Sequence, residues 1–262
     1  MIDEYLSVLG VGKAAPSVEY LFELHRAQVS RVPYTNVQIM RGRPASIDPR
    51  DAVRQILDGH GGYCFHLNGA FSWLLRELGF SITLHRGYVY RHGEAPAELN
   101  HLVLLAHDLE GGVWFVDAGL GDAIYEPLPL AAGEYGQGPF VYSLDFTGAR
   151  WRFTHDKLGS FGAMEFEPAA AVIEDFAEAH RRLSTSPESP FTRFLTAQIR
   201  LPDRVSIVRA CTSVVLDSSG KHEHYVDSWS VFVRAYASVG LSNVDDLWQH
   251  SRAAHTQWLA SL

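Results

Sequence analysis

The spacing of apolar residues predicts helices in about the first 80 residues of the chain. A rhythm of three- and four-residue intervals runs through residues 21–28 and ends at Pro33, which cannot continue a helix. A second helix is expected from Asp48, an N-cap residue followed by proline at the first helical position. A third is expected over residues 64–78, with Gly79 as its C-terminal stop.

Beyond this point the pattern changes to short β-branched and aromatic runs between turn residues, which is typical of strands. Such runs cover residues 81–90, 102–106, 113–116, 140–146 and 151–153. Helical spacing returns over 168–183, and a Ser/Pro-rich connector follows at 184–190. The last part has strand-like runs at 205–208, 214–216 and 225–229 and a helical pattern at 245–259. This order favours an α+β fold over a doubly wound sheet.

Composition excludes several classes of protein. The chain has 262 residues, of which 47% are hydrophobic and 20% charged, as in soluble globular proteins. A net charge of −8 without a dense Lys/Arg cluster argues against nucleic acid as a partner. No apolar run approaches the ~18 residues of a membrane span, and the first residues do not resemble a signal peptide. With only two cysteines, no disulfide framework is expected, so we predict a cytoplasmic protein.

Cys64 is the strongest candidate for chemistry. It begins the third predicted helix, where the N-terminal dipole favours a negative charge, and the thiolate is the reactive form of cysteine. Gly61 and Gly62 precede it and permit close approach of backbone and substrate. A nearby histidine could accept the thiol proton.

His101 and Asp117 are predicted to lie together. Residues 108–112 form a good hairpin turn, and a turn centred near Glu110 gives antiparallel pairs whose residue numbers sum to about 220. His101 then faces residue 119, and Asp117 is its diagonal neighbour at roughly 7–8 Å. The carboxylate could orient the imidazole, as the third member of a catalytic triad does.

Other interpretations remain open on spacing alone. A single cysteine is more often a small buried hydrophobic residue than a nucleophile. Asp117 precedes Ala118-Gly119 and could be a turn former. A zinc site made of Cys64, His101 and Asp117 is a weaker alternative, because no CxxC or HExxH pair supports it.

Several motifs, taken in order along the chain, resemble the arylamine N-acetyltransferases. They are His25 with Val32-Pro33-Tyr34-Thr35-Asn36, Gly61 to Phe65 with Leu67-Asn68-Gly69, Asn100 to Val103, Phe115 to Asp122, and Ser184 to Phe191. The resemblance runs nearly end to end. It implies an α+β fold with a cysteine-protease-like core: an N-terminal helical bundle carrying Cys64 (1–83), a central β-barrel carrying His101 and Asp117 (84–167), an interdomain helix and connector (168–198) and a C-terminal α/β lid (199–262).

The resemblance also implies ping-pong chemistry. Cys64 would take an acetyl or other short acyl group from acyl-CoA and pass it to an arylamine or arylhydrazine, with His101 as general base and acid and Asp117 orienting it. Acetyl-CoA would be a co-substrate, with no permanently bound cofactor and no metal. Positions matching the family's CoA and acceptor cleft are Asn100, Gly119 and Leu120; Tyr34 and Phe65 match aromatic positions near its acceptor pocket.

Three residues depart from the family pattern: His60 replaces an arginine, Thr35 a glutamate, and His66 a glutamate common in bacterial members. The first two family residues normally form an ion pair, so we expect a neutral His60–Thr35 contact in its place. The departures also leave room for an amide synthase that takes its acyl chain from an acyl carrier protein and passes it to an amine. A hydrolase using the same triad is a further alternative. A different class of protein, an inactive binding protein that keeps the fold, is the last alternative.

Overall fold

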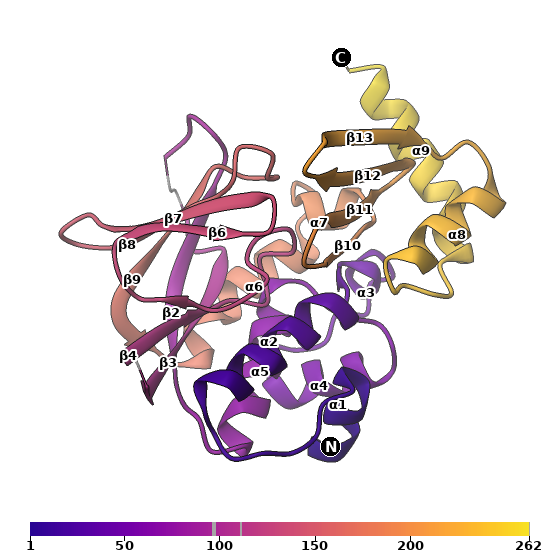
Figure 1. Ribbon diagram of the computed structural model, residues 1–262. Coiled ribbons are helices and arrows are strands. Elements are labelled where there is room, and N and C mark those ends of the chain that lie inside the picture. The colour runs from indigo at the N-terminus through magenta and orange to yellow at the C-terminus, as the bar shows by residue number, and fades with distance from the viewer. Residues whose placement is uncertain (96–97, 111, 262) are drawn as a thin grey trace.

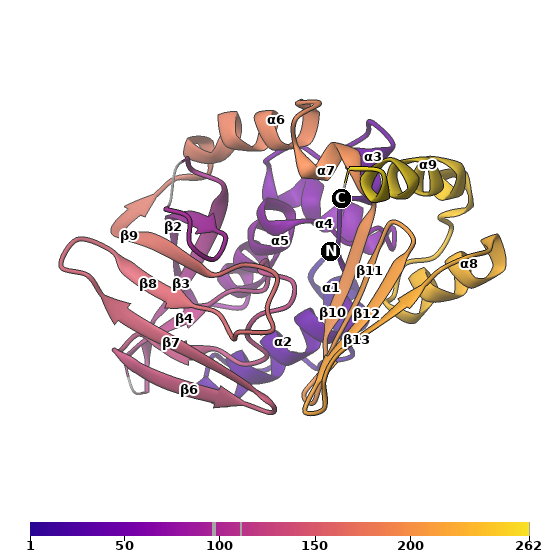
Figure 2. The same ribbon diagram turned by 90° about the horizontal axis from the view of Figure 1, so that it is seen from above.

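The computed structural model describes residues 1–95, 98–110 and 112–261. Within these ranges the chain forms a helical N-terminal part, an eight-stranded antiparallel sheet and a five-stranded antiparallel sheet (Figure 1). Seen from above, the helices of the N-terminal part lie between the two sheets (Figure 2). The α+β fold expected from the sequence is confirmed. No helix in the described ranges is both long and apolar enough to cross a lipid bilayer.

The N-terminal helices follow the apolar pattern closely. They are α1 (Ile2–Leu9), α2 (Val18–Arg31), α3 (Val37–Met40), α4 (Pro49–Leu57) and α5 (Cys64–Glu77). The side chain of Asp48 caps α4 by accepting from the amide of Arg50, and proline follows it, as predicted. Helix α5 ends just before Gly79, whose φ of +94° suits glycine. Because α5 is buried along most of its length, it forms the centre of this part.

The eight-stranded sheet carries the predicted hairpin. Its strands are β2 (Ser81–Tyr90), β3 (His101–Leu109), β4 (Gly112–Val116), β5 (Leu128–Pro129), β6 (Gly133–Gln137), β7 (Phe140–Phe146), β8 (Trp151–Thr154) and β9 (Ala163–Ala171), in the order β5-β4-β3-β2-β9-β8-β7-β6. Leu104 pairs with Val116 and Leu105 with Phe115, so the residue numbers sum to 220 and the predicted register is confirmed.

One predicted helix in this region is wrong at its start. Residues 168–171 belong to β9, and helical structure begins only at the short 3-10 helix Ile173–Phe176, followed by α6 (Ala177–Thr185). Pro168 lies where the pairing of β9 with β2 is irregular. A proline is tolerated there because the ladder does not require its missing N–H.

The C-terminal part pairs a sheet with two helices. After α7 (Pro190–Arg193) come β10 (Thr196–Arg200), β11 (Val205–Arg209), β12 (Thr212–Asp217), β13 (Gly220–Tyr225), α8 (Trp229–Ser238), a 3-10 helix (Asp245–Leu247) and α9 (Trp248–Leu259). The strand expected over 225–229 is wrong: β13 ends at Tyr225, and Trp229 begins α8. Phe232 and Tyr236 lie one turn apart on α8 and are both buried, so packing overrides the strand propensity of this segment.

A two-residue strand joins the N-terminal part to the C-terminal sheet. Strand β1 (Tyr34–Thr35) pairs with β10, so that Tyr34 lies opposite Gln198. On its other side Tyr34 forms a bridge with Gly62, two residues before Cys64. The chain segment that carries the cysteine is thereby fixed against both parts.

Candidate active site

Cys64 is the first residue of α5. It is almost fully buried, and its Sγ lies 3.6 Å from the carbonyl oxygen of Asn100. The loop that leads into Cys64 can pack closely only because residue 61 is a glycine. Gly61 has a φ of +58°, and a Cβ there would lie 2.2 Å from the carbonyl oxygen of Pro33. The glycine therefore lets the Pro33 segment pack directly against the cysteine loop, as the Gly-Gly pair suggested.

His101 and Asp117 form a short buried pair. The Nε2 of His101 lies 2.7 Å from Oδ2 of Asp117, and both side chains are at most 2% exposed. This is the side-chain contact that the hairpin register predicted. Because Nε2 is used by Asp117, Nδ1 is left for the cysteine, and Cys64 and His101 line the same cleft. The structure thus brings together all three residues of the predicted triad.

The charge state of His101 follows from its neighbours. Burial alone would lower its pKa, since it disfavours the charged ring, but the charge and hydrogen bonds of Asp117 and Cys64 outweigh it and raise the pKa of His101 to about 10. The imidazole is therefore held as an imidazolium at neutral pH. An imidazolium beside a thiol is the arrangement that stabilises a thiolate.

Asn68 is a site residue that the sequence reasoning missed. Its Nδ2 donates to Oδ1 of Asp117 at 2.8 Å and to the carbonyl of Leu102 at 2.6 Å, and its Oδ1 accepts from the amide of Ala118 at 2.9 Å. It thus fixes the carboxylate of Asp117 against the start of β3. The signal was its place four residues after Cys64, on the same face of the predicted helix.

Gly119 closes the same corner. Its amide donates to Oδ1 of Asp117 at 2.9 Å. A Cβ on Gly119 would lie 2.9 Å from the carbonyl oxygen of Cys64 and 2.8 Å from Nδ2 of Asn68. The absence of a side chain there lets the loop after β4 touch the beginning of α5.

A cleft of about 390 Å³ opens onto Cys64 and His101. Four of the five expected substrate-binding residues line it, namely Tyr34, Asn100, Gly119 and Leu120. Its other walls were not foreseen from the sequence. They are Val89, Tyr90, Arg91, Glu94, Ser160, Phe161, Leu183, Pro190, Phe191 and Gln198.

Phe65 lies elsewhere. It is 1% exposed, packs edge-on against Tyr63 and contacts Phe176, and it is not among the residues that line the cleft. Because α5 turns by about 100° per residue, the residue after Cys64 points away from the face that carries the sulfur.

The three departures from the family pattern have different surroundings. Thr35 is buried, and its hydroxyl accepts from the amide of Val37. His60 is partly exposed, and within the described ranges no hydrogen bond joins it to Thr35. The polar contact in this corner comes instead from Gln55, which donates to the carbonyl of Gly61 at 2.8 Å and bonds to His66 at 3.3 Å.

His66 belongs to a buried polar cluster behind the cysteine. Its Nε2 lies 3.1 Å from the carbonyl of Ala45, and its ring lies 5.3 Å from that of His180 on α6. The Nδ1 of His180 is in turn 2.6 Å from the hydroxyl of Tyr63. Burial first, and then the neighbouring His180, lower the pKa of His66 to about 3. His66 is therefore neutral at physiological pH, and burial lowers the pKa of His180 as well.

A second buried acid supports the cleft wall. Asp122 accepts from the amide of Ser160 at 2.7 Å and lies 3.3 Å from Nε2 of His155. This holds in place the loop that contributes Ser160 and Phe161 to the cleft. In the described part of the chain, no set of three or more His, Cys, Asp or Glu side chains is arranged to hold a metal ion.

Comparison with known proteins places the chain among acyltransferases. A family model described as N-acetyltransferase matches residues 17–229. The arylamine N-acetyltransferase 1 of Homo sapiens is 28% identical over 233 residues, which cover 78% of this chain and 79% of that protein. The arylamine N-acetyltransferase / N-hydroxyarylamine O-acetyltransferase of Salmonella typhimurium is 31% identical over 198 residues, which cover 72% and 68%.

Solved structures share the whole fold. The arylamine N-acetyltransferase from Mycobacterium abscessus matches with a TM-score of 0.85 at 20% identity, over 97% of this chain and 94% of that one. The enzyme of Mycobacterium marinum in complex with CoA matches with a TM-score of 0.84 at 22% identity, over 97% and 98%. The protein is thus an acyltransferase. More narrowly, the chain belongs to the arylamine N-acetyltransferase family, as the sequence motifs indicated.

Proposed function

We propose that this protein transfers an acetyl or other short acyl group from acyl-CoA to an arylamine or arylhydrazine by way of an acyl-cysteine on Cys64. The observation that carries the proposal is the 2.7 Å pair of His101 and Asp117 beside Cys64 in one cleft. The relatives named above as arylamine N-acetyltransferases and the M. marinum complex with CoA support the two substrates.

In the first half-reaction the thiolate of Cys64 attacks the carbonyl carbon of the acyl thioester. A new C–S bond forms to Cys64, the C–S bond to CoA breaks, and His101 gives its proton to the departing CoA sulfur. Asp117 keeps the imidazole in the required tautomer and orientation throughout. Free CoA leaves, and Cys64 holds the acyl group.

In the second half-reaction the amine attacks the acyl-cysteine. His101, now neutral, accepts the proton that the attacking nitrogen loses, and Cys64 departs as a thiolate beside the re-formed imidazolium. An amide or hydrazide is released. The aromatic side chains of Tyr34 and Phe191 in the cleft wall suit an aromatic acceptor. The comparisons give no support to an acyl carrier protein as the donor.

Intact-mass measurement tests the acyl-cysteine directly. The wild-type protein, incubated with acetyl-CoA and with longer acyl-CoA thioesters, should gain one acyl group, and Cys64→Ala should gain none. Cys211→Ala is the matched control, because Cys211 is the other cysteine and is fully buried; this variant should be acylated like the wild type. Equal acylation of Cys64→Ala would refute the proposal.

A further inference from the structure

Although the chain as a whole is acidic, with a net charge of −8, Arg91 lies in the wall of the cleft, Arg193 in the wall of a second cavity, and Arg209 close enough to feel the charge of both. The guanidinium of Arg209 lies 4.9 Å from the centre of the Phe194 ring, and that of Arg193 lies 5.5 Å from the same ring. Arg91 itself lines the cleft. Two guanidinium groups close to the same ring bring like charges together, which is unfavourable unless an anion is also present.

Arg91, Arg193 and Arg209 form no salt bridge with a carboxylate in the part of the chain that the structure describes. Within the described ranges, no carboxylate lies within 4.0 Å of Arg91, Arg193 or Arg209, whereas nearby Arg204 pairs with Asp203. Although Arg209 is solvent-exposed, the protein packed around its guanidinium lowers its pKa, and the charges of Arg91 and Arg193 lower it further. One acidic residue, Glu94, also lines the cleft, but it forms no ion pair with any of the three.

The strand geometry directs Arg209 toward the cleft. On β11, Ile207 pairs with Gln198, which lines the cleft. Side chains alternate along a strand, so Arg209, two residues on, lies on the same face. Burial and the charge of Cys64 raise the pKa of Tyr34, a second cleft residue, whereas the charge of Arg209 lowers it. The guanidinium of Arg209 is therefore close enough to Tyr34 to affect its hydroxyl. Arg209 thus borders the cleft on the side of Tyr34.

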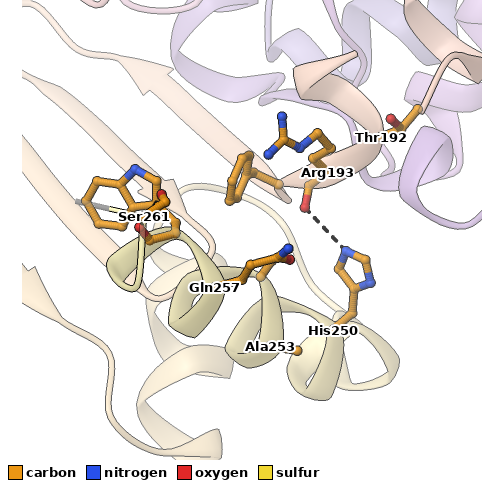
Figure 3. A pocket seen from close by; sticks show the side chains of 9 residues that line it. Thr192, Arg193, His250, Ala253, Gln257 and Ser261 are labelled. Carbon is orange, nitrogen blue, oxygen red and sulfur yellow. Dashed lines mark hydrogen bonds between the residues drawn. The ribbon is translucent and has the colours of Figure 1, made fainter. Parts of the chain in front are cut away.

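The position of Arg193 is set by α9. A cavity of about 350 Å³ lies between α7 and α9, and Arg193 forms part of its wall (Figure 3). The carbonyl oxygen of Arg193 accepts a hydrogen bond from His250 at 3.3 Å, while the guanidinium points away from α9 (Figure 3). The helix therefore anchors the backbone of Arg193 and leaves its charged end available to a ligand.

We infer that Arg91, Arg193 and Arg209 form a binding site for the phosphate groups of the acyl thioester. Guanidinium groups match phosphate oxygens in geometry and charge better than any other side chain. A thioester whose acyl end reaches Cys64 keeps its phosphates at the far end of the pantetheine arm, outside the reacting centre. This inference rests on the proposed function and names the part of the protein that recognises its donor.

Three donors separate phosphate recognition from chemistry. The rate of Cys64 acylation is measured from the free thiol that each donor releases. The donors are acetyl-CoA, 3′-dephospho-acetyl-CoA and S-acetyl-N-acetylcysteamine, which has no phosphate. For Arg209→Gln and Arg91→Gln we expect kcat/KM with acetyl-CoA to fall about five- to tenfold, mostly through KM. With the phosphate-free donor it should stay within about twofold. The salt dependence seen with acetyl-CoA should weaken in the same variants.

Arg204→Gln is the matched control, because this arginine lies just before β11 but already has Asp203 as its partner. It should behave like the wild type with every donor. If Arg209→Gln and Arg91→Gln lost the same fraction of kcat/KM with all three donors, or lost none with any donor, the inference would be overturned while acylation itself persists. If none of the three donors acylates the wild type, the proposed function falls, and this inference with it.

The anion could instead belong to the acceptor. Rates with 4-aminobenzoate, which carries a carboxylate, and with 4-methylaniline, which is neutral, distinguish the two sources. The inference expects the ratio of the two rates to be unchanged by Arg209→Gln. A selective loss with 4-aminobenzoate, without loss for acetyl-CoA, would assign the arginines to the acceptor and contradict the inference.

Discussion

At the scale of single residues, the reactivity assigned to Cys64 depends on side chains that do not line the cleft. Asp117 orients His101, and Asn68 orients Asp117 through a bond of 2.8 Å while also holding the backbone at Leu102 and Ala118. Each of these groups is buried, so each needs its partner. One amide thereby connects the helix of the cysteine with both strands of the histidine–aspartate hairpin.

Replacing Asn68 by alanine should therefore affect both stability and activity. The amide of Ala118 and one oxygen of Asp117 lose buried partners, which should destabilise the fold by about 1–3 kcal/mol. A less firmly held Asp117 should lower kcat/KM about ten- to a hundredfold and shift the pH profile of acylation. Urea unfolding and steady-state rates against pH measure both effects. Ser72, buried one turn later on α5, donates its hydroxyl to the carbonyl of Gly69, so Ser72→Ala should stay close to wild type in rate. Comparable rate losses in both variants would argue against a role for Asn68 in positioning.

At the scale of elements, the sequence predicted what depends on local pattern. Apolar spacing and turn residues predicted the start of α5 at Cys64. They also predicted the register of β3 and β4, in which the numbers of paired residues sum to 220. The sequence pattern did not predict that Pro168 belongs to β9, because its place in the sheet depends on the pairing with β2. Nor did it predict that α8 begins at Trp229, because the packing of Phe232 and Tyr236 determines the helix there. The walls of the cleft were missed for the same reason, because Arg91, Phe161 and Gln198 meet only through the tertiary fold.

The contact of α5 with α6 should make stability depend on pH. The pKa of His66 is lowered to about 3 by burial and by His180, against about 6.5 in the unfolded chain. Between these values the unfolded state binds the additional proton, so this residue costs stability as pH falls, by up to about 1.4 kcal/mol per pH unit. We expect the wild type to lose more stability than His66→Gln between about pH 7.5 and about pH 5.

Urea unfolding of the wild type and His66→Gln at both pH values measures how much free energy of unfolding each protein loses as the pH falls. His101, whose raised pKa acts in the opposite sense, and His180 are present in both proteins and largely cancel. Parallel pH dependences in the wild type and His66→Gln would show that His66 is not held neutral in the folded state.

At the scale of the whole molecule, the site exists only because separate parts of the chain meet. The helical part supplies Cys64, the eight-stranded sheet supplies His101 and the loop of Asp117, and the five-stranded sheet closes the cleft with Gln198. Strand β1 joins the first and last of these through the pairing of Tyr34 with Gln198 and its bridge to Gly62. Motifs in the sequence indicated the three residues of the proposed triad, but only the folded chain shows what surrounds them.

The rate at which iodoacetamide alkylates Cys64, followed against pH and located by mass spectrometry, tests the central claim most directly. In the wild type the rate should already be high well below pH 8 and stay level until about pH 10, where His101 loses its proton. Asp117→Asn should move the rise toward about pH 8.5, the range of an ordinary thiol. A wild-type rate that rises only near that value, and does not respond to Asp117→Asn, would contradict the account.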